Sequence, residues 1–404
     1  MTSSKAPSST TAPDLRNGGA PTCHVLATCG VFEPGFRGGG PVKSVAHVID
    51  TLPQDIELML ITGDRDLGSS DPYPGLSGTW VRRGQRASVF YLNARSPRSW
   101  SRLVRVLRKQ RIDLLYLNSL WSFYSLVPIL AIVAGLLSVP ATLIAPRGEL
   151  SPAALGLKRR KKQIFLLFWS RVLKRLDVWW HASNDFERAQ VLNVFPWARV
   201  LVQGCEATAP EQPIPPSGPN PGPLRIVFIS RISPMKNLTL ALAALRSLGQ
   251  PVEFDIFGPL EDGQYWAGCQ RLIADLPSHV RVRYRGELTP ERVRPTFSEY
   301  DAFLFPTLGE NFGHVILESL SASCPIICSD ATPWSALIEE AGGVIVRPLT
   351  AARLAADLET LARRSPLDRL RARQQAEAAY RSWRQRVSSG NVLADALTGE
   401  GRGT

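Results

Sequence analysis

Cysteine and histidine are scarce in this 404-residue sequence, which narrows the chemistry that it can carry. It contains six cysteines and five histidines, and no two cysteines form a C-x-x-C pair. Disulfide frameworks and structural zinc sites need cysteines that are paired or clustered. The sequence therefore predicts neither of them, and it fits a protein of a reducing cytoplasm.

The first residues lack the apolar centre of a secretory signal peptide. Residues 1–21 are rich in Ser, Thr, Ala, Pro and Gly. Such a composition cannot bury enough apolar surface to fold. We expect a disordered tail here.

Uncharged runs long enough to cross a membrane are absent with one exception, residues 114–146. Length alone permits a membrane span. Asn118, Ser119 and two prolines interrupt the run, which divides into a strand, a helix and a strand. Their expected ranges are 113–118, 122–136 and 141–145. Because parallel strands covered on both faces are continuously apolar, the sequence favours a buried β-α-β unit over a span.

Acidic residues are in short supply in the first half of the chain. Residues 1–205 hold 26 Lys and Arg against 13 Asp and Glu, whereas residues 206–404 hold 21 against 22. A solvated surface is one explanation. The other is contact with an anionic partner such as a membrane, a lipid phosphate or nucleic acid. Nucleic acid is not predicted as a partner, because the basic cluster has no recognition motif or stacking platform beside it.

The most basic stretch, residues 157–176, reads LKRRKKQIFLLFWSRVLKRL. As an amphipathic helix it would direct one set of side chains toward a core or a lipid surface: Ile164, Phe165, Leu167, Phe168 and Val172. A domain helix with a solvated basic end remains an alternative. Together with the basic first half, the stretch favours peripheral association with an anionic inner leaflet.

Strand-like and helix-like stretches alternate in two series. The first domain is expected at 22–205, and residues 206–223, dense in Pro and Gly, are expected to be a linker. A second domain is expected at 224–386, followed by a frayed tail at 387–404. Its expected strands are 224–230, 252–258, 282–286, 302–307, 325–330 and 342–348, and its expected helices include 236–248, 263–275, 313–323, 350–363 and 366–384. Two such series predict an α/β protein with two doubly wound, Rossmann-like parallel sheets facing a cleft.

One loop of the second domain carries two acids eight positions apart. In GENFGHVILES, Glu310 follows strand 302–307 and Glu318 lies in helix 313–323. Ligands of open α/β sheets bind at the carboxyl ends of strands. The N–H groups of residues 311–314 suit an oxyanion or a sugar hydroxyl, and carboxylates accept hydrogen bonds from vicinal hydroxyls. From the spacing alone, a helix-start acid and an exposed helix charge remain an equal alternative.

Two other loops at strand ends have residues suited to the same ligand. Arg231 follows strand 224–230, and Lys236 comes five residues later, so two cations could meet a diphosphate. In the first domain, glycines 38–40 follow a strand and allow backbone to approach a phosphate or a sugar. Each loop alone is weak evidence, because loop cations are usually solvated. Together they predict a site for a sugar that carries a diphosphate.

These segments resemble the retaining, GT-B fold glycosyltransferases of family 4, also called glycosyltransferase group 1. The resemblance covers residues 22–390 and is most specific in RISPMKN, FDIFGP, YRGELT and FPTLGENFGHVILESLSASCPIICSDATPW, which contains the family's E-x7-E motif. FRGGGPVKSV and APRGELSPAALGLKRRKK are similar to the acceptor side of the bacterial cell-surface polysaccharide branch.

The resemblance implies transfer of a hexose from a nucleotide diphosphate sugar, with retention at the anomeric carbon. The acceptor would be a glycan or a polyprenyl-diphosphate-linked sugar in lipopolysaccharide or exopolysaccharide biosynthesis. The implied catalytic residues are Glu310, Arg231 and Lys236. The implied donor-binding residues are Gly39, Gly40, Gly286, Glu287, Leu288, Asn311, Phe312, Gly313, His314 and Glu318. The implied acceptor-side residues are Asn118, Ser119 and Arg147.

The resemblance also distributes roles among these residues. Arg231 and Lys236 would hold the diphosphate, Glu318 the ribose hydroxyls, and Glu310 with the 311–313 amides the donor sugar. Gly39 and Gly40 would face phosphate, and residues 286–288 the base. No metal and no cofactor is expected, since cations can stabilise the leaving diphosphate.

The sequence departs from the family in the first domain. Many relatives have a histidine where this chain has Asn118 and Ser119. Neither is a base at neutral pH, so a phosphate oxygen of the leaving group is expected to take the acceptor's proton. Two alternatives stay open: a non-catalytic protein that binds nucleotide sugars, and another GT-B enzyme such as an epimerase or a phosphorylase. The expected location is the cytoplasm, with the inner face of the plasma membrane as a peripheral site.

Overall fold

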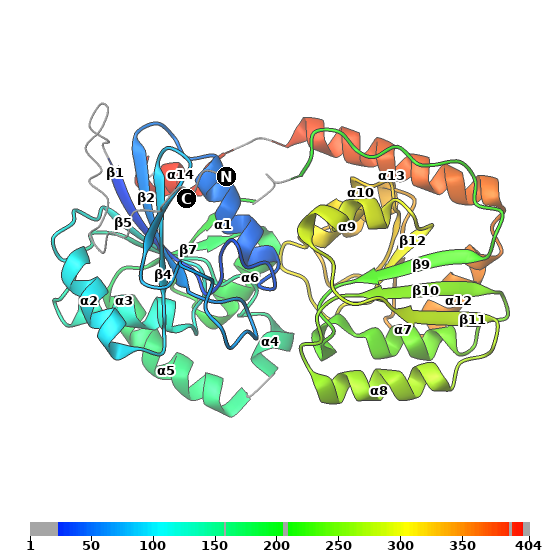
Figure 1. Ribbon diagram of the computed structural model, residues 1–404, viewed down its shortest axis with the longest axis horizontal. Coiled ribbons are helices and arrows are strands. Elements are labelled where there is room, and N and C mark those ends of the chain that lie inside the picture. The colour runs from blue at the N-terminus through cyan, green and yellow to red at the C-terminus, as the bar shows by residue number, and fades with distance from the viewer. Residues whose placement is uncertain (1–22, 157–158, 205–208, 388–389, 399–404) are drawn as a thin grey trace, which may run out of the picture. The chain divides into compact units, whose positions relative to one another are not determined.

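The computed structural model describes residues 23–156, 159–204, 209–387 and 390–398. It divides the chain into two compact units (Figure 1). Unit 1 is Met1–Thr208 together with Ser389–Thr404, and unit 2 is Ala209–Ser388. The expected disordered tail, residues 1–21, lies outside the described residues. None of the described helices combines the length and the apolar character that a membrane span requires.

In the described part of unit 1, one sheet has the strand order β3-β4-β2-β1-β5-β6-β7-β8. All neighbouring strands are parallel except β3, which is antiparallel to β4. The strands are β1 Cys23–Thr28, β2 Ile56–Gly63, β3 Trp80–Arg83, β4 Ala87–Leu92, β5 Leu114–Leu117, β6 Thr142–Ile144, β7 Trp179–Ala182 and β8 Arg199–Val202. The helices are α1 Gly40–Asp50, α2 Pro97–Leu107, α3 Phe123–Val133, α4 Pro152–Gly156, α5 Arg159–Arg175, α6 Asp185–Val194 and α14 Val392–Thr398.

Helices cover both faces of this sheet, and each face has its own core. Helices α2, α3 and α5 pack on one face, and α1 and α14 pack on the other (Figure 1). Burial on both sides explains why the central strands are continuously apolar. The uncharged run 114–146 accordingly forms β5, α3 and β6, as the sequence favoured. The expectation of a buried helix is only half right, because one side of α3 is exposed, as at Phe123.

The described part of unit 2 contains a parallel sheet with the order β11-β10-β9-β12-β13-β14. The strands are β9 Leu224–Ile229, β10 Val252–Phe257, β11 Val280–Tyr284, β12 Ala302–Phe305, β13 Ile326–Ser329 and β14 Val344–Val346. The helices are the 3-10 helix η2 Pro234–Lys236, α7 Leu238–Leu245, α8 Gly263–Ala274, α9 Pro290–Phe297, α10 His314–Leu320, α11 Ser335–Glu340, α12 Ala351–Ala362 and α13 Pro366–Arg386. The doubly wound α/β prediction is confirmed for both units.

The proline-rich segment 206–223 differs from the linker that its composition predicts. Its described part, from residue 209 on, belongs to unit 2. The backbone N–H of Ile214 donates to the carbonyl of Ser321 at 2.8 Å, and the Tyr380 hydroxyl donates to the carbonyl of Pro210 at 2.7 Å. Residues 209–223 form neither helix nor strand, and backbone hydrogen bonds help to attach them to unit 2, so no periodic pattern reveals them.

The expected frayed tail, 387–404, is also different from the structure. Helix α14 packs into the core of unit 1, where Val392 and Leu393 are buried. The side-chain amide of Asn391 donates to the carbonyl of Val48 and to Oγ1 of Thr51, both at 2.9 Å. Residues 399–404 lie outside the described residues. Helix α14 has only 7 residues, which are too few to show the apolar period that would predict its burial.

Candidate active site

The strand order of unit 2 reverses at one place. Strand β9 has β10 on one side and β12 on the other, so the chain proceeds in opposite directions from this pair. A doubly wound sheet opens a crevice at the carboxyl ends of its strands at such a point. The loops that follow β9 and β12, residues 230–237 and 306–313, contain Lys236 and Glu310. Topology alone therefore brings these two predicted site residues together.

Lys236 ends the short helix η2 and is 9% exposed. Asn237 follows it with φ 56°, a left-handed conformation that closes the turn before α7. This turn replaces the first residues of the expected helix 236–248. The Lys236 ammonium lies 2.5 Å from Oε2 of Glu310 and 5.2 Å from the centre of the Phe305 ring. The turn thus places the Lys236 ammonium beside Phe305, the last residue of β12.

Backbone hydrogen bonds fix the loop that contains Glu310. The N–H of Leu308 donates to the carbonyl of Met235 at 2.9 Å, and the N–H of Glu310 donates to that of Ala331 at 2.9 Å. The loop after β12 is therefore attached both to the loop after β9 and to the one after β13. Because backbone hydrogen bonds fix this loop on two sides, the Glu310 side chain is preorganised: its backbone need not move when a ligand binds.

Gly313 immediately precedes helix α10, as its N-cap residue, with φ 81°. A Cβ at this position would lie 2.9 Å from Cγ of Glu310 and 3.0 Å from Cδ1 of Ile316. Only glycine combines this backbone conformation with this lack of space. The helix is shorter than the expected range 313–323, because it ends at Leu320 and Ser323 has a left-handed φ of 54°.

An aromatic cluster packs where the loop after β12 meets helix α10. The Phe312 ring lies 4.6 Å from the His314 ring and 5.3 Å from the Trp334 ring, between centres. The Trp334 indole N–H donates to the carbonyl of Phe312. Phe312 and His314 are buried, so the packing of this loop accounts for both side chains. Asn311 and Glu318 lie on the loop and on α10, half-buried.

Arg231 lies at the end of β9 but pairs with a residue that the sequence did not indicate. Its guanidinium lies 3.0 Å from Oε1 of Glu261, and both side chains are 39% exposed. Neighbouring loops pack closely here: a Cβ on Gly258 would lie 1.8 Å from the carbonyl oxygen of Ser230. Because Glu261 is in the loop after β10, no spacing rule connects it with Arg231.

The expected base-contact segment, residues 286–288, follows β11. Strand β11 ends at Tyr284, two residues earlier than expected, so this segment is loop. Gly286 has φ 83°, and its carbonyl accepts the N–H of Gly258 at 2.9 Å. Leu288 packs against the core of unit 2. The loops after β9, β10 and β11 thus lie side by side at one edge of the sheet.

In unit 1 the strand order reverses between β1 and β5, and the glycine-rich loop follows β1. Gly39 precedes α1 with φ 67°, and a Cβ there would meet nothing within 4 Å. Gly40 is the first residue of α1. The backbone at Gly39 is therefore open to its surroundings, as an approaching ligand would require.

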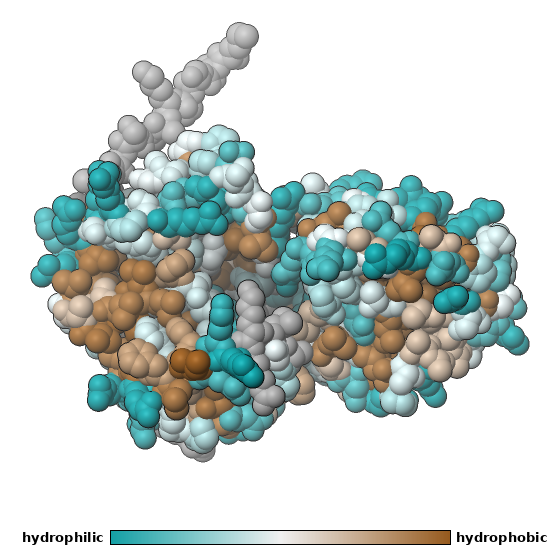
Figure 2. All heavy atoms as spheres, turned by 90° about the horizontal axis from the view of Figure 1, so that it is seen from below, coloured by the Kyte–Doolittle hydropathy of each residue, from teal (hydrophilic) through white to brown (hydrophobic). Residues whose placement is uncertain are grey.

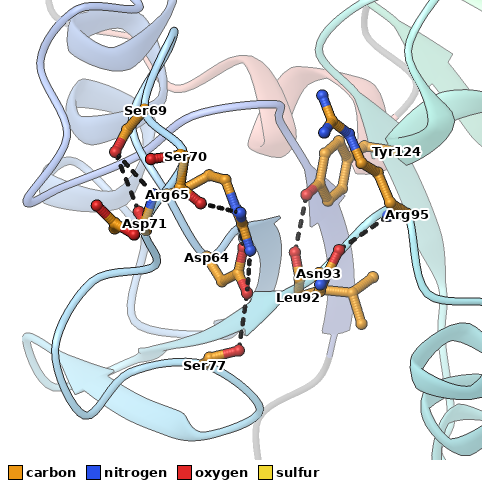
Figure 3. Close-up of polar contacts among 10 residues, drawn as sticks. All are labelled: Asp64, Arg65, Ser69, Ser70, Asp71, Ser77, Leu92, Asn93, Arg95 and Tyr124. Carbon is orange, nitrogen blue, oxygen red and sulfur yellow. Dashed lines mark hydrogen bonds and ion pairs between the residues drawn. The ribbon is translucent and has the colours of Figure 1, made fainter.

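A second loop of unit 1, residues 64–79, braces this glycine-rich loop. The Asp66 carboxylate accepts the N–H groups of Phe36 at 3.1 Å and of Arg37 at 3.2 Å. Asp64 anchors the bracing loop at the end of β2, because its carboxylate accepts the Arg65 guanidinium at 2.9 Å and the Ser77 hydroxyl at 2.7 Å (Figure 3). Nearby, the Tyr124 hydroxyl donates to the carbonyl of Leu92 at 2.9 Å.

Asn118 and Arg147 meet at the carboxyl ends of β5 and β6. The Arg147 guanidinium donates to Oδ1 of Asn118 at 2.8 Å and to the Tyr116 hydroxyl at 2.7 Å. That hydroxyl also lies 2.8 Å from Nδ1 of His181, whose Nε2 lies 2.9 Å from the carbonyl oxygen of Gln203. A carbonyl can only accept, so Nε2 carries the proton and Tyr116 donates to Nδ1.

His181 stays neutral in this network. Burial and the nearby Arg147 charge lower the pKa of His181 to about 3. The imidazole is buried, and it also orients the Tyr116 hydroxyl that holds Arg147. A lone histidine in a strand gave no signal of that second role.

Ser119 is held by a carboxylate, Glu149, that is not among the predicted site residues. Its hydroxyl donates to Oε1 of Glu149 at 2.8 Å, and the N–H of Leu120 donates to Oε2 at 2.5 Å. Burial raises the pKa of Glu149. The APRGEL segment contains this glutamate, and its place two residues after Arg147 was the available signal. Glu149 thus orders the loop after β5.

The family model of glycosyl transferases group 1 matches residues 211–381. Residues 211–381 form a glycosyl transferases group 1 domain. This domain contains Arg231, Lys236, Glu310 and Glu318. Among its described residues, as in the rest of the described chain, no cluster of three or more His, Cys, Asp or Glu could hold a metal ion. Metal independence itself stays a prediction.

Two curated relatives match a similar share of the chain. O-antigen chain mannosyltransferase B of Escherichia coli is 24% identical over 177 residues, which are 39% of this chain and 45% of that protein. D-inositol 3-phosphate glycosyltransferase of Nocardia farcinica is 31% identical over 176 residues, 40% of this chain and 38% of that protein. The match spans less than half the length of these relatives.

Solved structures extend the likeness to nearly the whole chain. HepE of Anabaena, in complex with UDP and glucose, superposes with a TM-score of 0.66 at 16% identity, and the match covers 93% of this chain and 100% of that one. At this identity the likeness shows the fold alone. The group 1 domain is thus part of a chain with the GT-B fold.

Proposed function

We propose that this protein is a retaining glycosyltransferase, which moves a sugar from a nucleotide diphosphate sugar to a glycan or lipid-linked acceptor in cell-surface polysaccharide biosynthesis. The observation that carries the proposal is the contact of Lys236 with Glu310 at the switch point of a glycosyl transferases group 1 domain. The donor class is supported by the relatives. HepE was solved with UDP and glucose, and one curated relative is named a mannosyltransferase of O-antigen chains.

The charges of the site suit the departure of a nucleoside diphosphate. Negative charge grows on the leaving oxygen as the glycosidic bond lengthens, and fixed cations lower the barrier only if they act on that charge. Lys236 would exchange part of its contact with Glu310 for a phosphate oxygen. Arg231, which is more exposed, would turn from Glu261 to the second phosphate. Each contact of this kind is worth about 3 kcal/mol in the transition state.

Glu310 would then face the donor sugar. A carboxylate accepts hydrogen bonds from sugar hydroxyls, and the backbone bonds of its loop hold it in position. Glu318 would accept the ribose hydroxyls from α10. Reaction on the same face of the sugar keeps the anomeric configuration. The acceptor's proton would pass to a phosphate oxygen, because Asn118 and Ser119 are not bases at neutral pH.

We further propose that the reaction needs no metal and no cofactor. In this scheme Arg231 and Lys236 offset the charge of the bound diphosphate and the charge that grows on the leaving oxygen, so a divalent ion is not needed for that role. Activity that persists in excess EDTA would agree with this proposal. Activity that is abolished by EDTA and restored by Mg²⁺ or Mn²⁺ would contradict it.

The test is a donor panel. The purified chain is incubated with UDP- and GDP-linked sugars, and release of the nucleoside diphosphate is followed with and without added glycan acceptors. We expect one donor to turn over, and Glu310→Gln to lower kcat about a hundredfold while donor affinity changes little. Binding without turnover of any donor would favour a non-catalytic protein. Free sugar with an inverted carbon would favour an epimerase, and a dependence on inorganic phosphate would favour a phosphorylase.

A further inference from the structure

One helical layer of unit 1 has an outer surface to which the transfer reaction assigns no role. Helices α2, α3 and α5 pack on the same face of the sheet through one core cluster, which includes Leu103, Ile129 and Leu173. Their opposite sides point to solvent. We call this outer side the α2-α3-α5 surface.

Large apolar side chains are exposed on the α2-α3-α5 surface. On α5, Ile164, Leu167 and Phe168 are 72%, 66% and 65% exposed. The others are Phe123, Leu130 and Val133 of α3, and Leu136, which follows it. Figure 2 shows a broad hydrophobic area with hydrophilic side chains around it, on the side of unit 1 where Figure 1 draws these helices. Soluble proteins rarely expose apolar patches of this kind without a partner.

The five apolar residues of α5 that the sequence predicts on one face are divided between two faces in the structure. Phe165 and Val172 pack against the core, whereas Ile164, Leu167 and Phe168 point outward. The core therefore accounts for only some of these side chains. The outward three have no covering element among the described residues.

The charged side chains of this surface are all of one sign. Exposed cations line α2 and α5: Arg98, Arg102, Arg105, Lys161, Arg171, Lys174 and Arg175. No Asp or Glu occurs in residues 95–112, 114–148 or 150–176. In unit 2, several helix arginines pair with an acid on the same helix, as Arg381 does with Glu377 at 2.8 Å on α13. An ordinary solvated helix of this chain thus mixes charges, and the α2-α3-α5 surface does not.

We propose that the α2-α3-α5 surface docks the protein on an anionic lipid bilayer. Ile164, Leu167 and Phe168 enter the boundary between headgroups and acyl chains, and the surrounding arginines and lysines contact lipid phosphates. Apolar side chains within a basic helical surface are the combination that interfacial binding needs. A two-fold dimer through this surface would oppose like charges, and a nucleic acid groove has little use for exposed Ile and Leu.

This inference deepens the proposed function, because a lipid-linked acceptor would lie at such a surface. The inference rests on the proposed function only where it connects the α2-α3-α5 surface with a lipid-linked acceptor. Lipid binding can be measured without any sugar. Loss of donor turnover with intact lipid binding would count against the proposed function alone, and the reverse result against this inference alone.

The experiment is flotation of the full chain with vesicles of phosphatidylglycerol and phosphatidylcholine in equal parts, compared with phosphatidylcholine alone. We expect binding to the anionic vesicles, which weakens as salt is added. The triple variant Ile164→Ser, Leu167→Ser, Phe168→Ser should bind about tenfold more weakly. Its control, Leu367→Ser, changes an exposed apolar residue of unit 2 and should bind like the unchanged protein.

A second pair of variants tests the charges. Arg171→Gln, Lys174→Gln, Arg175→Gln should bind anionic vesicles about tenfold more weakly. Arg353→Gln, Arg363→Gln, Arg371→Gln removes as many charges from helices of unit 2 and should have no effect. All four proteins should keep the circular dichroism of the unchanged chain. The inference is overturned by the absence of vesicle binding, by equal losses in test and control variants, or by a surface that instead forms a dimer or binds nucleic acid.

Discussion

The ammonium of Lys236 lies 2.5 Å from the Glu310 carboxylate, although the two residues are 74 positions apart in sequence. Their side chains are only 11% and 17% exposed. Taking both charges out of water is costly, and the pair compensates that cost only while both partners are present. A ligand with a phosphate group for Lys236 and hydroxyl groups for Glu310 would replace the ion pair that the two residues form with each other.

Lys236→Met and Glu310→Gln should each lower the free energy of unfolding by about 2 kcal/mol, because each leaves one charge without its partner. The double variant should lose less than the sum of the two. A double-mutant cycle by urea denaturation measures this coupling, which we expect to exceed about 1 kcal/mol. Strict additivity would mean that the pair contributes nothing to the folded state.

Gly313→Ala should destabilise unit 2 by about 2–3 kcal/mol, through left-handed strain and contact with Glu310. Donor turnover should fall as well, since the added methyl group displaces the carboxylate. Gly286→Ala is the control for stability: its φ of 83° is similar, but a Cβ there meets nothing within 4 Å. Equal destabilisation of the two variants would show that the contact with Glu310 has no cost.

The stability of unit 1 should depend on pH through His181. Its pKa is about 3 in the folded state and near 6.5 when unfolded, so protons favour the unfolded chain. The stabilisation is complete above pH 6.5 and is lost as the pH falls toward 3. Between pH 7.5 and 5.5 we expect a loss of about 1.4 kcal/mol from this residue.

Urea unfolding of the unchanged protein and of His181→Gln at these two pH values measures that loss. The variant lacks the titrating group, so its stability should fall less over the same interval. His279→Gln, in unit 2, is the matched control and should keep the full pH dependence. Identical curves for all three proteins would contradict the assignment.

Asn391→Ala should lower the unfolding free energy of unit 1 by about 1–3 kcal/mol, because the buried carbonyl of Val48 and hydroxyl of Thr51 lose their donor. Hydrogen exchange of the α1 amides should accelerate in parallel. Thr398→Ala, which removes an exposed bond within α14, should change stability by less than about 0.5 kcal/mol. No effect of Asn391→Ala would mean that α14 contributes little to unit 1.

Local pattern was sufficient for most strands and for the residues at their ends. Continuous apolar runs such as 114–117 predicted strands of doubly wound sheets, and the strand ends then located Lys236 and Glu310. Pattern failed where packing uses backbone groups or few side chains. Residues 209–223 join unit 2 through backbone hydrogen bonds and a few side chains such as Ile214, and α14 is too short to show a period. Neither feature leaves a repeat in the sequence.

The partners of the site residues were the other omission. Arg231, after β9, pairs with Glu261, after the neighbouring strand β10. Likewise Ser119, after β5, donates to Glu149, after the neighbouring strand β6. Contacts between loops depend on which strands are neighbours. Spacing along the chain does not contain that order. For the same reason the role of His181 in holding Arg147 became visible only in three dimensions.

The sequence by itself determined the α/β alternation, the basic character of the first half and the kinds of side chain at the strand ends, because these follow from local composition and period. Tertiary structure decided which of those side chains meet. In the folded chain Lys236 pairs with Glu310, and the apolar residues of α5 are divided between core and solvent. Helix α14, at the end of the chain, packs into the core of unit 1. Each of these outcomes depends on strand order and on burial by distant elements, which are properties of the folded chain alone.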